Sequence, residues 1–143
     1  DSREIIPEDL PLFVRISATD WLENGWTIED SIKLSTILKD RGVDLVDCSS
    51  GGLTPPEKIP VGFGYQVTFA QSIREKTGIK TGAVGMIVSP QQAEEIITTK
   101  KADLVFLARE MLRDPYFPLR AAYELGYNIE WAKQYERAKR VKK

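Results

Sequence analysis

Arg15 is the first residue whose type and position suggest chemistry. It lies within the run Phe13–Ser17, where strand alternation places Phe13, Arg15 and Ser17 on one face. A guanidinium inside a strand must reach an anion, a cavity or solvent, because an uncompensated buried charge is costly. Arg15 therefore either lines an anion-binding site or forms a structural ion pair with a neighbouring acid such as Asp47, and the pattern leaves both open.

Arg109 is the second candidate. It follows the apolar run 104–107 and begins a segment short enough for one helical turn. One predicted strand earlier, the run 81–85 contains Gly82 and Gly85, where the backbone can approach a ligand closely. Barrel enzymes bind phosphate between such strand ends, because unpaired N–H groups point there. The pattern favours a phosphate site, with a surface arginine and packing glycines as the alternative.

The residue types that are absent exclude several kinds of chemistry. The sequence contains no histidine, which removes every Ser-His or Cys-His catalytic pair. It also leaves a structural zinc site without its usual ligands, so no metal is expected. The one cysteine, Cys48, cannot form an internal disulfide and is interpreted as a small buried hydrophobic residue.

Composition predicts a folded domain that binds neither nucleic acid nor membrane. The 143 residues include 20 basic and 21 acidic side chains, so the net charge is −1, and 42% of residues are hydrophobic. Nucleic-acid binding needs clustered positive charge, which only the last dozen residues offer. The chain has neither an apolar run of membrane-spanning length nor a signal-peptide pattern. We expect a reduced, cytoplasmic setting.

Repeated strand-and-helix units must position the two arginines. Apolar runs predict strands, and apolar residues at helical spacing follow each run. Thr27 with Asp30 predicts a capped helix start, as does Ser89 followed by Pro90. Strands are predicted at 13–17, 43–48, 79–87 and 104–107, with helices at 27–42, around 67–77, from 89 through 97 and from 114 onward, the last after a single turn at 109–112.

This order predicts a parallel α/β fold with right-handed crossovers. Four such units are half of a (β/α)₈ barrel, and 143 residues are too few to close one. A small doubly wound sheet is the other candidate, and the pattern alone does not separate the two. We expect one unit over residues 1–143, with the basic segment 128–143 as a C-terminal tail.

Several long segments together resemble the C-terminal half of the old yellow enzyme family. The match is closest to its thermophilic-like bacterial branch of NADPH-dependent flavin oxidoreductases and xenobiotic reductases. The resemblance covers nearly the whole chain, in order and with compatible spacing. It rests on Phe13–Trp21 (FVRISATDW), Val43–Gly52 (VDLVDCSSGG), Pro60–Val67 (PVGFGYQV), Thr81–Ile87 (TGAVGMI) and Ala108–Phe117 (AREMLRDPYF).

The resemblance implies an FMN-dependent TIM-barrel enzyme, an ene-reductase. In such enzymes NAD(P)H reduces the flavin, which then passes a hydride to an activated alkene. Arg15 matches the family arginine beside the pyrimidine end of the flavin, where a cation stabilises the reduced ring. Arg109 and the backbone of Ala108 match the phosphate-gripping pair, although many relatives have glycine where Ala108 stands. The neighbouring phosphate wall matches Gly82, Ala83 and Gly85.

The resemblance also implies contacts with a partner subunit and with the other half of the barrel. The segment Gln134–Arg137 resembles a C-terminal motif whose arginine reaches a partner's active site, so Arg137 is the expected contact across a homo-oligomer. The substrate-binding His or Asn pair and the proton-donating Tyr belong to the other half, so no catalytic residue maps onto this chain. The fragment alone is therefore expected to be inactive. The alternative is a silent half-barrel, which either assembles with an N-terminal half or another copy, or binds a phosphate ligand.

Overall fold

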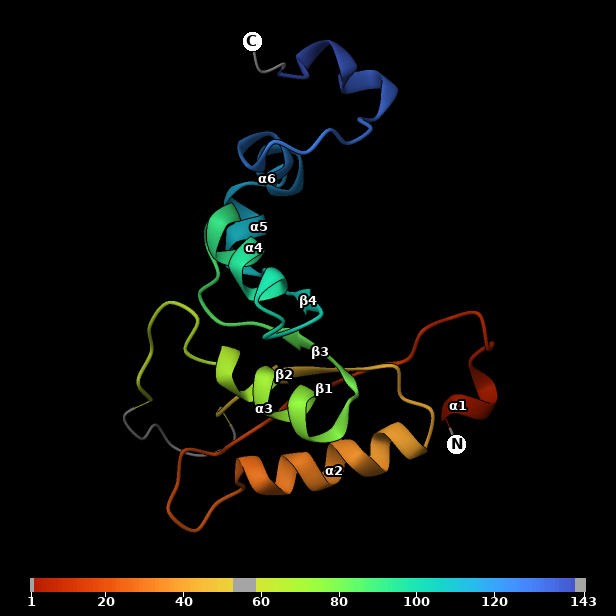
Figure 1. The fold of residues 1–143 in the computed structure, drawn as a ribbon, viewed down its shortest axis with the longest axis vertical. Coiled ribbons are helices and arrows are strands. Elements are labelled where there is room, and N and C mark those ends of the chain that lie inside the picture. The colour runs from red at the N-terminus through yellow and green to blue at the C-terminus, as the bar shows by residue number, and fades with distance from the viewer. Residues whose placement is uncertain (1, 53–58, 141–143) are drawn as a thin grey trace.

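The computed structural model describes residues 2–52 and 59–140, which form parallel strands and helices in alternation (Figure 1). The strands are β1 (Phe13–Ser17), β2 (Leu45–Ser49), β3 (Lys80–Ala83) and β4 (Leu104–Val105). The helices are α1 (Ser2–Ile5), α2 (Ile28–Asp40), α3 (Val67–Thr77), α4 (Pro90–Thr98), α5 (Arg109–Arg113) and α6 (Phe117–Leu125), followed by the 3₁₀ helix η1 (Lys133–Ala138).

The four strands form one parallel sheet in the order β1-β2-β3-β4. Each strand pairs with the next in sequence, and the order never reverses. A doubly wound sheet would contain a reversal, the point at which such folds bind ligands. Successive parallel strands joined by helices are the arrangement of a (β/α)₈ barrel, so the predicted half-barrel is confirmed.

The sheet has one face covered by helices and one that carries the charged residues. In-register neighbours on parallel strands point to the same side, and Arg15, Asp47, Gly82 and Leu104 are such neighbours. We call their side the lumen face, because it faces inward in a barrel. The opposite face packs against the helices, and its buried core includes Val46, Cys48, Ala70, Ile73, Ala83 and Ile96.

The helix ends follow the capping chemistry read from the sequence. Thr27 accepts a hydrogen bond from the Asp30 amide, and the Asp30 carboxylate accepts one from the Thr27 amide, which forms the predicted capping box. The Ser89 side chain likewise accepts from the Gln92 amide, with Pro90 at the start of α4. Helix α3 ends at Gly78, whose φ of 66° is the left-handed conformation that glycine tolerates.

Three strand predictions were wrong in their boundaries. Strand β2 begins at Leu45 rather than Val43, and β4 has two residues rather than four. Strand β3 ends at Ala83 rather than Ile87, because Gly85 and Met86 both have positive φ, which extended strands do not allow. The apolar run 84–87 therefore forms a loop above the sheet.

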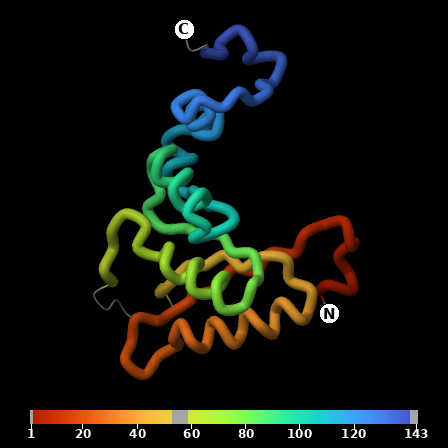
Figure 2. The backbone as a smooth tube through the Cα atoms, in the orientation of Figure 1, coloured from red at the N-terminus to blue at the C-terminus, as the bar shows by residue number. Residues whose placement is uncertain are grey.

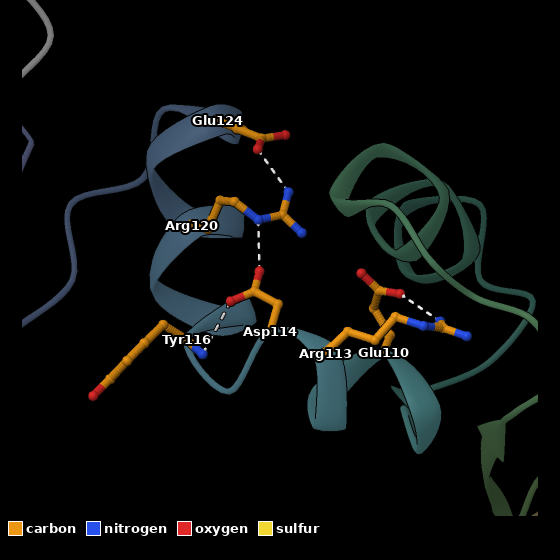
Figure 3. Close-up of polar contacts among 6 residues, drawn as sticks. All are labelled: Glu110, Arg113, Asp114, Tyr116, Arg120 and Glu124. Atoms are coloured by element: carbon orange, nitrogen blue, oxygen red, sulfur yellow. Dashed lines mark hydrogen bonds and ion pairs between the residues drawn. The ribbon is translucent and has the colours of Figure 1, made fainter.

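Helix α6 begins at Phe117, three residues after the predicted cap Asp114, because Asp114 makes a turn instead of a helix cap (Figure 3). Its carboxylate accepts a hydrogen bond from the Tyr116 amide at 3.1 Å and pairs with the Arg120 Nε at 2.7 Å. Arg120 also pairs with Glu124 at 2.7 Å. These contacts hold the first turns of α6 against the end of α5.

Two segments were not anticipated as regular structure. Helix α1 precedes the first strand, and residues 133–138 of the expected tail form η1. The tube in Figure 2 shows this C-terminal segment at one end of the molecule and the N-terminal segment toward the other. Within the described ranges 2–52 and 59–140, no helix has both the length and the apolar character needed to span a membrane.

Candidate functional site

A cavity of about 220 Å³ lies at the carboxyl ends of β3 and β4. It is bounded by the loop after β3 and by the start of α5. This is the end of a parallel sheet at which barrel enzymes carry their active sites. The lining includes Tyr65, Gln66, Gly85, Met86, Ala108, Arg109, Glu110 and Arg113.

One of the charged side chains that line this cavity has no partner of opposite charge among the described residues. Glu110 pairs with Arg113 at 3.1 Å, as Figure 3 shows. The Arg109 side chain, by contrast, is exposed and has no hydrogen bond or ion pair within residues 2–52 and 59–140. The cavity therefore has an unbalanced positive charge beside the backbone of two strand ends. Such a combination suits an anionic group, because an arginine offers several donors in one plane.

Gln66 lines the cavity and connects two of the loops around it by hydrogen bonds. It was not identified from the sequence as a candidate site residue. Its side chain is buried and joins two loops: its Oε1 accepts from the Ser50 hydroxyl at 2.6 Å, and its Nε2 donates to the Val84 carbonyl at 3.1 Å. A Cβ on Gly85 would lie 2.7 Å from this Nε2, so only glycine fits there, at a φ of 118°. Gln66 lies in the segment Pro60–Val67 that carries the resemblance, but no periodic pattern marks it, because its burial depends on contacts between loops distant in the chain.

Arg15 and Asp47 form the ion pair that the sequence left open. They are in-register neighbours on β1 and β2, and Arg15 Nε lies 2.5 Å from Asp47 Oδ2. Burial raises the pKa of the Asp47 carboxyl, and the hydrogen bond from Arg15 opposes that shift. The ion pair does not exclude the anion-binding interpretation, because the two terminal nitrogens of Arg15 form no hydrogen bond or ion pair with other described residues.

The predicted phosphate wall is only partly in the cavity lining. Gly85 lines the cavity, whereas Gly82 and Ala83 lie lower, within β3. Ala83 is fully buried on the helix-covered face. Gly82 lies beneath the Phe106 ring, and a Cβ there would be 2.0 Å from Phe106 Cε2. Phe106, which also lines the cavity, is therefore the residue that occupies the space above Gly82.

Arg137 and Cys48 lie apart from this cavity. Arg137 is exposed in η1 and is absent from the cavity lining. Cys48 is buried on the helix-covered face, where burial raises the pKa of its thiol to about 12. A thiol that stays protonated is a poor nucleophile. In the part of the chain that the structure describes, no group of three His, Cys, Asp or Glu residues is placed to bind a metal ion.

Four parallel βα units in sequential strand order, with a cavity at the carboxyl ends of β3 and β4, define part of a (β/α)₈ barrel. Within that class, residues 2–128 match the NADH:flavin oxidoreductase / NADH oxidase family, so the chain belongs to this FMN-dependent family. The chain is 52% identical over 141 residues to an NADPH dehydrogenase of Halalkalibacterium halodurans (strain C-125), covering 95% of this chain and 41% of the relative. It is 55% identical over 130 residues to an NADPH dehydrogenase of Bacillus pumilus (strain SAFR-032), covering 91% and 38%.

Solved structures show the same fold. A 2-naphthoyl-CoA reductase bound to 2-naphthoyl-CoA has a TM-score of 0.74 at 22% identity, over 87% of this chain and 19% of that one. Histamine dehydrogenase from Rhizobium sp. 4-9 has a TM-score of 0.65 at 20% identity, over 81% and 17%. At these identities the likeness concerns the fold alone. The chain spans about two fifths of the length of the curated relatives it matches.

Proposed function

We propose that this chain is the FMN-phosphate-binding half of an NAD(P)H oxidoreductase of the ene-reductase type. The observation that carries the proposal is the placement of two arginines that keep N–H donors without a partner among the described residues. Arg109 is at the cavity beyond β3 and β4, and Arg15 is on β1. Arg109 follows β4, which is three spacings of about 4.8 Å from β1, so the two are roughly 14 Å apart across the sheet. A ligand with negative charge at both ends matches this separation.

The residues of the cavity fit a phosphate. Arg109 has its donors available, Gly85 adds no side chain to the cavity wall, and the amides at the start of α5 lack partners within the helix. Arg109 would bind the phosphate oxygens by charge-assisted hydrogen bonds. Ala108, whose side chain is a methyl group, keeps its backbone donor available.

Arg15 would act at the other end of the cofactor. Its free terminal nitrogens would donate to the pyrimidine edge, where a fixed cation stabilises negative charge without reorganisation. When bound, FMN supplies hydride acceptance from NAD(P)H and hydride donation to an activated alkene. The residues that bind the substrate carbonyl and supply the proton are assigned to the rest of the barrel.

The test is an FMN titration followed by flavin fluorescence. This chain is measured alone and with the remaining half of the barrel supplied as a second polypeptide, and NADPH is then added without oxygen. We expect tight binding and flavin reduction only in the mixture. Reduction in the mixture must be coupled to consumption of an activated alkene if the ene-reductase assignment is correct. Absence of binding in both settings would overturn the proposal.

Arg109→Ala tests whether this residue binds the FMN phosphate. Loss of a charge-assisted partner should weaken FMN binding roughly tenfold to hundredfold. Arg41→Ala removes the same charge from an exposed position just after α2 and should leave binding unchanged. Equal effects of the two substitutions would show that net charge, and not a phosphate site at Arg109, controls binding.

A second candidate function is assembly without catalysis. The observation that favours it is the lumen face, where Phe13 and Leu104 are 45% and 42% exposed at the two edges of the sheet. We take the remaining half of the barrel as the occupant, because parallel strands can pair at both edges. Assembly without FMN binding would support this candidate over the first.

A further inference from the structure

The Arg15–Asp47 pair is built asymmetrically. The Asp47 side chain is only 7% exposed, whereas the Arg15 side chain is 60% exposed. The carboxylate is therefore fixed within the sheet, and the arginine extends outward from it. Because the two residues are in-register neighbours, their Cβ atoms lie about 5 Å apart, which leaves the guanidinium beyond the carboxylate.

The contact uses one edge of the guanidinium. Arg15 donates through Nε to Asp47 Oδ2. The four N–H groups on Nη1 and Nη2 are donors in the same rigid plane. Within residues 2–52 and 59–140 they have no partner. The carboxylate thus holds one edge of the guanidinium plane, while the donors on its other edges have no partner among the described residues.

Stability alone does not account for this pair. Burial of a carboxylate is costly, and Asp47 Oδ1 is a buried oxygen with no partner among the described residues. Apolar residues of similar volume are often as stable as a buried ion pair, or more so. An ion pair with one exposed member also contributes little. The geometry therefore points to orientation rather than to fold stability.

We propose that Asp47 is a positioning residue that holds Arg15 by its Nε edge so that Nη1 and Nη2 face an anionic ligand group in the lumen. This inference rests on the proposed function, in which that group is the pyrimidine end of FMN. Asp47 does not touch the ligand and acts only through Arg15. The role explains why a carboxylate occupies a strand position that neighbouring residues bury.

The first experiment needs no flavin. The Arg15 Nε–H resonance is assigned in this chain by comparison with Arg15→Lys. We expect a shifted, slowly exchanging signal that Asp47→Asn moves toward the free-arginine position and that Asp47→Glu partly restores. The control is Asp44→Asn, which breaks a different Arg–Asp pair, with Arg3 at 3.3 Å, at the other end of the sheet. An Arg15 signal unaffected by Asp47→Asn would overturn the proposal.

The second experiment uses the FMN-loaded mixture of this chain with the remaining half of the barrel. Its midpoint potential measures how much more tightly reduced FMN binds than oxidised FMN. We expect Asp47→Asn to lower this affinity ratio roughly tenfold, within the range for coupled neighbours. For a two-electron couple that is about 30 mV. Asp44→Asn should leave the potential unchanged. In an Arg15→Met background, Asp47→Asn should have no further lowering effect, because the group it orients is gone.

The outcomes separate this role from the proposed function. An unchanged ratio in Asp47→Asn, or an equal decrease in the Arg15→Met background, overturns the positioning role while FMN binding stands. Failure of FMN to bind overturns the proposed function and this role with it. A loss that depends on Arg15 supports positioning, since a general structural defect would appear in both backgrounds.

Discussion

At the residue scale, two of the closest contacts involve glycines at which an added side chain would meet a neighbouring residue. Gly82 accommodates the Phe106 ring, and Gly85 accommodates Gln66 and Tyr65. The sequence indicated that both glycines allow close approach, but it could not identify what approaches. The neighbours are protein side chains, and pairwise contacts between distant loops leave no periodic signal in one sequence.

The Gly82 contact predicts a steric effect. Gly82→Ala would place a Cβ 2.0 Å from Phe106 Cε2, so the ring must move. Overpacking of this kind should lower the free energy of unfolding by about 1–3 kcal/mol, measured by urea denaturation. Gly62→Ala is the control, because nothing lies within 4 Å of its Cβ position. A second substitution, Phe106→Leu, should recover part of the loss, and failure to recover would contradict the assigned contact.

Cys48 predicts a pH effect of defined sign. The pKa of its thiol is raised to about 12 in the fold, above the ordinary value of 9.0. The unfolded chain therefore loses this proton first, and stability falls as pH rises from about 9 to 12, by roughly 1.4 kcal/mol per pH unit. Cys48→Ala should lack this slope. Urea denaturation of both proteins between pH 8 and 10.5 measures the difference, and parallel curves would refute the prediction.

At the element scale, helix starts were more predictable than strand ends. The signals for α2 and α4 are local, since a capping side chain bonds an amide two or three residues away. Strand ends depend on the neighbouring strand and on backbone φ. Strand β3 therefore ends at Ala83 although the apolar run continues. The start of α6 is the exception among the helices, because Asp114 forms a turn and binds Arg120 instead of capping the helix.

The capping box of α2 gives a comparison between identical substitutions. Thr27→Ala removes the acceptor for the Asp30 amide and should destabilise the protein by about 1 kcal/mol. Thr36→Ala, in the exposed middle of the same helix, removes only a bond to the Ile32 carbonyl and should be neutral or stabilising, because alanine is the better helix former. Thermal or urea unfolding measures both. Equal losses would indicate that the cap contributes nothing specific.

At the scale of the whole molecule, the described helices cover one face of the sheet. The helices pack against the core face, while the lumen face carries Arg15 and the exposed edge residues Phe13 and Leu104. Alternation of strands and helices was sufficient to predict the parallel sheet, and the observed strand order selects the half-barrel over the doubly wound alternative. The sequence could not predict which residues meet in the cavity, because that depends on strand register and loop geometry.

The exposed lumen residues predict how this chain associates with the other half of the barrel. Each large apolar side chain that becomes buried contributes about 1.5–3 kcal/mol. Phe13→Ser combined with Leu104→Ser should therefore weaken the complex at least roughly hundredfold, measured by sedimentation or titration calorimetry. Ile37→Ser combined with Ile97→Ser, on the outer helices α2 and α4, should leave the affinity unchanged. Equal weakening would argue against lumen-face pairing.

Helix α1 lies at the end of the sheet opposite the cavity. Arg3 of α1 contacts Asp44, which precedes β2, whereas the cavity lies beyond the last residues of β3 and β4. The C-terminal segment continues instead from α6, on the side of α5 (Figure 1). A fluorophore or surface anchor joined ahead of α1 would therefore leave the cavity mouth unobstructed, which makes the N-terminal end the place to immobilise the chain for binding measurements.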